Sequence, residues 1–158
     1  AQVRSRIAVR SSGAEWGNRI RFLPRLPSNN YTYVLAQSTL LMDSFPYSGF
    51  TTSIEAMVMG TPVVTIDGSR TRSSQTSAIL RTISKDDPSV LKIFQECCIA
   101  VDVEGYMSRV LRLSRDPEYR NFVSRLIKSN IDSFFEEKHV VVPKWKKFLH
   151  RAVAARSF

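Results

Sequence analysis

The sequence predicts an α/β domain in which a parallel sheet carries helices on both faces and a helical tail follows. Two observations support this prediction. Short, continuous apolar runs alternate with longer segments of helical periodicity, a pattern typical of parallel sheets whose strands are buried on both faces. From Pro117 onward the helical pattern continues with no further strand. We therefore expect one domain over residues 1–158, with 117–158 as its helical tail.

The first third of the chain predicts two helices and two strands. Residues 1–16 combine arginines with regularly spaced apolar residues, which favours a helix, and arginines alternate with apolar residues near 19–23, which favours a strand. Ser28 is a suitable N-cap for a helix that ends near Gln37. The apolar run at 39–42 predicts a buried strand.

The middle of the chain repeats this alternation. A helix over 52–59 stops at Gly60, and the apolar run 62–66 predicts the next strand. A polar loop leads into a helix over 73–84. We expect the strands near 19–23, 39–42, 62–66 and 97–101 to lie in one parallel sheet.

The remaining chain predicts helices and one strand. Asp86, Asp87 and Pro88 open a short helix through Phe94, and the strand 97–101 follows. Three further helices are predicted near 102–115, 117–131 and 139–155. Cys97 and Cys98 are expected to be small buried residues of the strand rather than a disulfide.

Residues 43–68 are the most informative segment for function. A helix that opens at Thr51 and Thr52 presents free backbone N–H groups, two hydroxyls and the positive end of the helix dipole, which suits a phosphate. Glu55 follows within the first turn, and a carboxylate can accept both hydroxyls of a ribose. A structural alternative stays open: Thr52 caps its own helix, and Glu55 completes a capping box with it.

The same segment resembles the protein O-GlcNAc transferase family of two-domain glycosyltransferases. The matching positions are Asp43, Gly49, Thr51, Thr52, Glu55, Gly60, Thr61, Pro62, Val63, Val64 and Thr65. Upstream, residues 19–31 resemble the family segment that holds the base, and the likeness fades after about Leu80. The resemblance implies a Rossmann-like domain that forms the C-terminal, nucleotide-sugar-binding half of a GT-B glycosyltransferase.

The resemblance also implies roles for residues of the helix start. Thr51 and Thr52, beside Gly49, would hold the diphosphate of a UDP-sugar, and Glu55 would bind the ribose hydroxyls. Phe50 stands where the family has a histidine near the diphosphate. Because phenylalanine donates no hydrogen bond, an apolar wall is the better interpretation of this position.

The base and a possible second loop fall on other positions. Leu26, Ser28 and Tyr31 lie where the family holds uracil, with Ser28 in place of a lysine and Tyr31 in place of a stacking histidine. Tyrosine can still stack on a base. Arg70 and Arg72 lie in a Ser/Thr-rich loop that corresponds to a phosphate or acceptor loop of the family.

The expected function is the donor-binding half of an inverting glycosyltransferase that transfers N-acetylglucosamine or another hexose from UDP to protein side chains. The catalytic base and a phosphate-binding lysine of the family are expected upstream of residue 1, so the isolated chain should bind the donor weakly and be inactive. No cofactor, metal site or membrane span is expected, and the enzyme should be cytoplasmic or nuclear. As part of a two-domain cleft, Tyr47, Phe50 and the loop 67–72 should be exposed.

Two alternatives remain open at this stage. Phe50 and Ser28 are compatible with a non-catalytic, nucleotide-binding pseudo-enzyme. The net charge of +9, concentrated near both ends of the chain, is compatible with a nucleic-acid or polyanion-binding module, or with a solvated basic face. His139 and His150 have no catalytic partner in the sequence and are expected at the surface.

Overall fold

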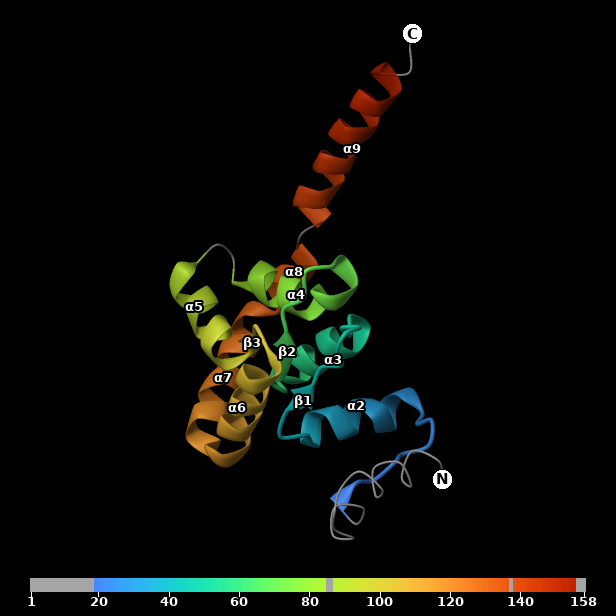
Figure 1. Ribbon diagram of the computed structural model, residues 1–158. Helices are drawn as coiled ribbons and strands as arrows, with labels where there is room; N and C mark the ends of the chain where they lie inside the picture. The colour runs from blue at the N-terminus through green and yellow to red at the C-terminus, as the bar shows by residue number, and fades with distance from the viewer. Residues whose placement is uncertain (1–18, 85–86, 137, 156–158) are drawn as a thin grey trace. The chain divides into compact units, whose positions relative to one another are not determined.

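The computed structural model describes residues 19–84, 87–136 and 138–155 (Figure 1). The chain divides into two units, residues 1–31 and 32–158. Within the first unit, residues 20–27 form neither helix nor strand, and helix α2 (Ser28–Gln37) begins at its end. The predicted end at Gln37 is confirmed, and the helix begins one residue earlier than an N-cap at Ser28 predicts.

The strand predicted near 19–23 is wrong. Phe22 and Leu23 are exposed, and Pro24 and Pro27 follow within a few residues. The alternation that suggested a strand spans only four residues, and a strand needs a sheet partner to satisfy its backbone groups. The helix predicted over 1–16 lies outside the described residues.

The second unit is built on a parallel sheet of three described strands in the order β1-β2-β3. The strands are β1 (Leu41–Met42), β2 (Val63–Ile66) and β3 (Ile99–Ala100). Leu41 pairs with Val63, and Thr65 pairs with Ile99. All four residues of the central strand β2 are buried, as the continuous apolar run predicts.

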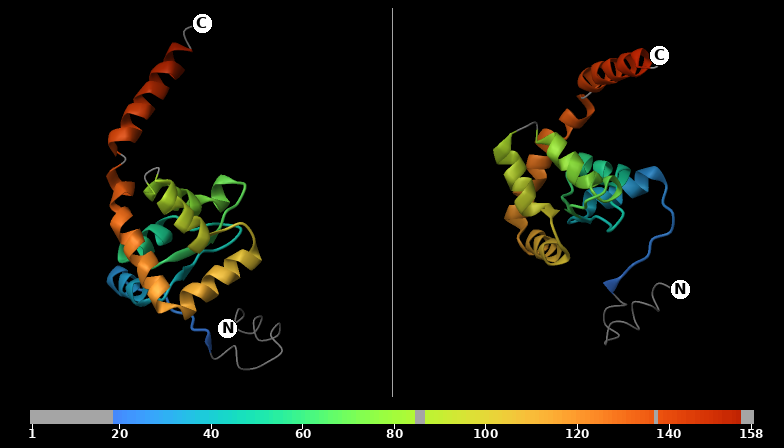
Figure 2. Two further views of the ribbon diagram at one scale, coloured as in Figure 1. Left: turned by 90° about the vertical axis from the view of Figure 1, so that its left-hand side faces the viewer. Right: turned by 45° about the horizontal axis from the view of Figure 1, so that its top comes forward.

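Helices follow each strand and lie on both faces of the sheet, with α4 and α5 on one side and α6 on the other (Figure 2). The helices after β1 and β2 are α3 (Thr51–Met59), the 3₁₀ helix η2 (Thr71–Ser73), α4 (Gln75–Ile83) and α5 (Pro88–Cys97). Those after β3 are α6 (Val103–Arg115), α7 (Pro117–Asn130), α8 (Asp132–Glu136) and α9 (Lys138–Ala154). The predicted α/β class with a helical C-terminal region is confirmed.

Local sequence explains where the helices begin and end. Gly60 ends α3 with a φ of 79°, and its N–H donates to the carbonyl of Met57. A side chain at Gly60 would also collide with Lys128 of α7. Asp87 and Asp116 accept backbone N–H groups at the starts of α5 and α7, and each precedes a proline at the first helical position.

Cys97 and Cys98 are buried, as expected, but they do not lie in a strand. Cys97 is the last residue of α5 and Cys98 caps that helix, so β3 begins only at Ile99. Both thiols are free, with their Sγ atoms 3.1 Å apart. Phe94, one turn earlier, is fully buried, because the end of α5 is part of the core.

Candidate functional site

The candidate site lies where β1 and β2 end. Each strand is followed directly by an aspartate, Asp43 after β1 and Asp67 after β2. In a parallel sheet these carboxyl ends lie at the same edge, which is where open α/β sheets bind their ligands. A hydrogen bond of 2.9 Å from the Ser48 N–H to the Arg72 carbonyl joins the loops that follow the two strands.

The first loop, residues 43–50, is organised around the buried carboxylate of Asp43. Its Oδ1 accepts the backbone N–H groups of Ser44 at 3.0 Å and Gly49 at 2.7 Å. Its Oδ2 accepts the hydroxyls of Ser48 and Thr65, each at 2.7 Å. The N–H of Gly49 is therefore engaged by Asp43.

The start of α3 presents unused backbone donors. The first hydrogen bond of the helix runs from the Ile54 N–H to the Phe50 carbonyl at 3.0 Å. Within the described part of the chain, the N–H groups of Thr51, Thr52 and Ser53 have no acceptor. Thr51 and Thr52 are exposed, so their hydroxyls are accessible beside these N–H groups.

The capping interpretation of Thr52 and Glu55 is wrong. The helix begins one residue earlier than expected, so Phe50 is the N-cap and no side-chain bond caps the helix. Thr52 is then the second helical residue, too late to cap the helix. Glu55 is exposed, and its carboxylate has no hydrogen-bond partner among the described residues. Its spacing of four residues from Thr51 and three from Thr52 places all three on one helix face.

Phe50 forms an apolar wall at the helix start. Its ring lies edge-on to Phe134 of α8, with centroids 6.4 Å apart, yet 48% of the residue is exposed. Tyr47 is 62% exposed, and residues 69–72 of the second loop are exposed as well. The expectation that these residues are accessible is confirmed for all but Asp67 and Gly68, which are half-buried.

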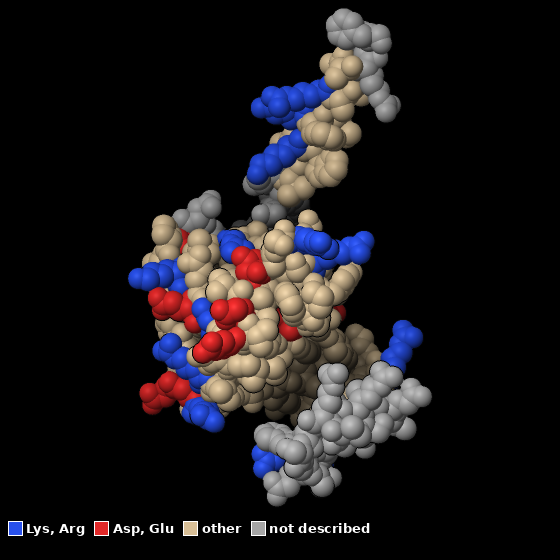
Figure 3. All heavy atoms as spheres, in the orientation of Figure 1, with Lys and Arg blue, Asp and Glu red and all other residues tan. Residues whose placement is uncertain are grey.

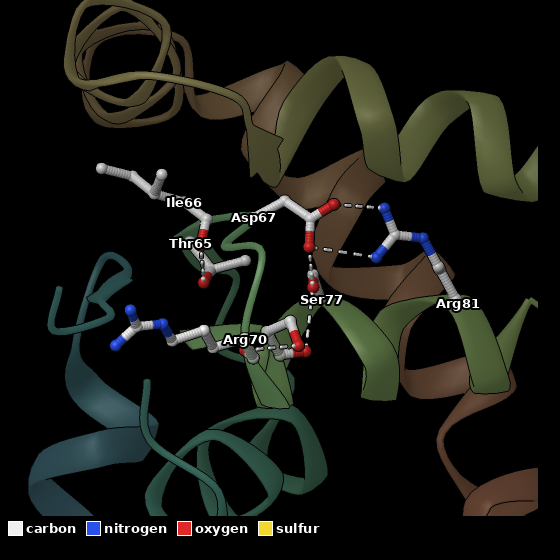
Figure 4. Close-up of polar contacts among 7 residues, drawn as sticks. Thr65, Ile66, Asp67, Arg70, Ser77 and Arg81 are labelled. Atoms are coloured by element: carbon white, nitrogen blue, oxygen red, sulfur yellow. Dashed lines mark hydrogen bonds and ion pairs between the residues drawn. The ribbon is translucent and has the colours of Figure 1, made fainter. Parts of the chain in front are cut away.

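The second loop is fixed by Asp67 (Figure 4). The Arg81 guanidinium donates to Asp67 Oδ2 at 2.7 Å, and the Ser77 hydroxyl donates to Oδ1 at 2.6 Å. The hydrogen bond from Arg81 contributes most to holding the pKa of Asp67 below its ordinary value, and that from Ser77 adds to it. Burial acts in the opposite direction. Asp67 is thus an ionised anchor for the loop.

Arg70 and Arg72 are exposed residues of this loop. Figure 4 shows the Arg70 side chain extending away from Asp67 and Arg81. The Arg70 backbone binds Ser73, whose N–H donates to the Arg70 carbonyl at 2.9 Å. Because the Arg72 carbonyl accepts the Ser48 N–H, the structure brings this loop against the loop that precedes α3.

The residues expected to hold the base lie at the end of the first unit. Leu26 is half-buried in the segment before α2, Ser28 is the exposed first residue of that helix, and Tyr31 is half-buried in its first turn. The Tyr31 N–H donates to the Pro27 carbonyl at 3.0 Å. Their role in base binding remains a prediction.

Several polar residues of the site were not singled out by sequence reasoning. Asp67 and Arg81 form an ion pair across 14 residues, Thr76 bonds to Ser48 across 28, and the Tyr106 hydroxyl donates to the Asp43 carbonyl at 2.9 Å across 63. The one available signal was the aspartate that directly follows β1 and β2. Contacts between residues so far apart in the sequence leave no local pattern from which they could be predicted.

Residues 141–154 of the last helix, α9, are exposed, and they include basic residues as well as apolar ones such as Trp145 and Leu149. Figure 3 shows basic side chains along one edge of this helix. None of the described helices is both long and apolar enough to cross a membrane. The described residues also contain no cluster of His, Cys, Asp and Glu that could hold a metal.

Comparison with known proteins supports the fold. No protein-family model matches the chain, and no curated protein matches it. Among solved structures, it is similar to a mutant of the O-GlcNAc transferase of Thermobaculum terrenum, with a TM-score of 0.63 and 27% sequence identity. The match covers 86% of this chain and 26% of that enzyme, so the chain spans about a quarter of its length. The chain therefore has a glycosyltransferase-like fold.

Proposed function

We propose that this chain is the donor-binding part of a glycosyltransferase, with the diphosphate of a UDP-sugar held at the start of α3. The observation that carries the proposal is the pair of exposed residues Thr51 and Thr52, whose N–H groups have no acceptor among the described residues and lie beside their own hydroxyls. Helix starts of this kind bind phosphate through their N–H groups and the helix dipole. The loop before α3 also lies at the carboxyl edge of the sheet, where open α/β sheets bind their ligands.

The remaining site residues take roles around the diphosphate. Glu55 lies on the same helix face as Thr51 and Thr52, where its free carboxylate would accept the ribose hydroxyls. Arg70 and Arg72 would add positive charge from the neighbouring loop. Phe50 would form an apolar wall rather than donate to the phosphates, and Leu26, Ser28 and Tyr31 would hold the uracil.

In the transfer reaction, the task of this chain would be to stabilise the leaving group. As the bond from the sugar to the diphosphate breaks, negative charge grows on the phosphate oxygens. Donors already aimed at that position stabilise the transition state more than the ground state. The base that activates the acceptor, a protein side chain, would come from another part of the enzyme, consistent with a match to 26% of the similar transferase.

Calorimetric titration with uridine, UMP and UDP tests the proposal. We expect affinity to rise from uridine to UDP, because each added phosphate meets the donors of the α3 start. The double substitution Thr51→Val and Thr52→Val should lower UDP affinity about tenfold by removing two hydroxyl donors, and should leave uridine affinity unchanged. Equal affinity for the three compounds would remove the phosphate role of α3.

A further inference from the structure

We propose that Asp43 is a positioning residue for the diphosphate: its buried carboxylate fixes the loop 43–50 in the conformation that presents the first N–H groups of α3. This inference rests on the proposed function, because it concerns how that phosphate site is held in place. Asp43 does not itself face the ligand, since it is only 8% exposed and its oxygens are occupied by protein donors.

The carboxylate connects the sheet to the loop. The Asp43 N–H donates to the Val64 carbonyl at 2.9 Å, which ties the residue to β2. Of the four donors to its oxygens, Thr65 belongs to the sheet, whereas Ser44, Ser48 and Gly49 belong to the loop. Hydrogen bonds to an ionised carboxylate are stronger than neutral ones, so three of them hold a loop of eight residues firmly.

A second set of bonds holds the loop from the side of α4. The Thr76 N–H donates to Ser48 Oγ at 3.0 Å, and the Thr76 hydroxyl donates to the Gly49 carbonyl at 2.8 Å. Ser53, in the first turn of α3, lies 2.8 Å from the Thr76 hydroxyl. The polar groups of the loop are thereby turned inward, and the N–H groups of Thr51 and Thr52 are left outside.

Two further contacts show how closely this loop is packed. A Cβ at Gly49 would lie 3.1 Å from Asp43 Oδ1 and 3.2 Å from Ser53 Oγ, which leaves little room for a side chain. The Tyr106 hydroxyl donates to the Asp43 carbonyl at 2.9 Å, and burial raises the pKa of this phenol, so it stays a donor at neutral pH. These contacts leave the loop few alternative conformations.

A positioning role and a purely electrostatic role of Asp43 predict opposite effects of its removal on UDP affinity. If its charge acted only at a distance, removing it would favour a diphosphate and tighten UDP binding. If the carboxylate positions the donors, its removal shifts them and weakens UDP binding, because such donors act only when correctly aimed. A purely structural role would weaken uridine and UDP equally.

The test measures the ratio of UDP to uridine affinity by calorimetry in folded variants of the full chain. Asp43→Asn and Ser48→Ala should each lower that ratio about threefold to tenfold, the effect of losing one or more charge-assisted hydrogen bonds. The matched control is Thr61→Val, which removes a buried hydroxyl bond of 2.7 Å to the Leu35 carbonyl at the opposite end of β2. This control should lose stability and keep the wild-type ratio.

The outcomes separate this inference from the proposed function. A wild-type chain that prefers UDP, with a ratio unchanged in Ser48→Ala, would overturn the role of Asp43 alone. Tighter UDP binding by Asp43→Asn would overturn it too, and so would an equal loss of the ratio in Thr61→Val. A wild-type chain with no preference for UDP would overturn both proposals. If Asp43→Asn does not fold, Ser48→Ala decides.

Discussion

At the level of single residues, the structure decides between the two interpretations of Glu55. Glu55 had two interpretations, a ribose ligand or half of a capping box, and the box is not formed. An exposed carboxylate with no partner among the described residues is free to accept hydroxyls from a ligand. Ser53, two residues earlier, is buried and faces Thr76, so only one face of the first turn is available to a ligand.

Replacing Glu55 by Gln should weaken UDP about tenfold and 2′-deoxy-UDP less, because the amide accepts only through one oxygen. Titration calorimetry with the two nucleotides measures the difference. Glu104→Gln is the matched control, since Glu104 is an exposed carboxylate in the first turn of α6 and should affect neither nucleotide. Equal losses for both nucleotides would rule out a ribose role for Glu55.

The stability of Thr52→Ala tests whether the Thr52 side chain caps α3. Because no side-chain bond caps α3, we expect the free energy of unfolding to change by less than about 0.5 kcal/mol, as at ordinary surface positions. Asp102→Ala removes a real cap, the 2.7 Å bond to the Gly105 N–H, and should cost about 1 kcal/mol. Urea denaturation compares the two, and a larger loss in Thr52→Ala would restore the capping role.

Asp67 should make stability sensitive to acid. Its pKa is lowered in the folded state, chiefly by the hydrogen bond from Arg81, so its contribution is fully present above the unfolded pKa. That contribution should vanish as pH falls below about 4, through the folded pKa. Because the ion pair is partly exposed, we expect less than about 1 kcal/mol.

The measurement is the difference in unfolding free energy between the wild type and Asp67→Asn as a function of pH. The difference should be constant near neutral pH and shrink in acid. A difference that keeps its neutral-pH size throughout the acid range would mean that the neutral carboxyl group makes the same contacts.

At the level of helices and strands, Cys97 and Cys98 offer a test of how well α5 is anchored. Both thiols are buried, and the pKa of Cys98 is raised well above its ordinary value by its hydrogen bond to Cys97 and by burial. Alkylation depends on thiolate and access, so labelling of the native chain should proceed only through unfolding. Rapid labelling by iodoacetamide at pH 8 would contradict the packing of α5 against β3.

Most of the element boundaries could be predicted because they are set locally. Gly60, Pro88 and Pro117 mark helix ends through their own backbone preferences, and the structure places the ends at these residues. The apolar runs that became β2 and β3 could be recognised because parallel strands are buried on both faces. The run at 39–42 also contains a strand, but the expectation that it is buried is wrong, because Met42 of β1 is 50% exposed.

Two of the failures share one cause, which is dependence on distant partners. The segment near 19–23 has strand-like alternation, but a strand exists only where a neighbour pairs with it. The bonds of Asp43 to Thr65 and of Ser48 to Thr76 join residues 22 and 28 positions apart. The sequence predicted the anion-binding helix start of the proposed site, but not the polar network beneath it.

At the level of the whole molecule, we expect donor binding and acceptor activation to lie in different parts of the enzyme. The chain spans 26% of the similar transferase, and we propose that the acceptor base lies elsewhere in the enzyme. The isolated chain should therefore bind UDP weakly and release no UDP from UDP-N-acetylglucosamine or UDP-glucose in a coupled assay with peptide acceptors. Robust transfer by this chain alone would mean that the base lies within it.

A UDP titration followed by amide chemical shifts in NMR spectra tests whether the start of α3 holds the diphosphate. We expect the largest shifts at Thr51 and Thr52, which are exposed and whose N–H groups have no acceptor within the described residues. Uridine should leave these amides nearly unchanged, because it lacks the phosphates. The largest shifts at another helix start, such as Gly105 in α6, or an equal response to uridine, would contradict the claim that α3 holds the diphosphate.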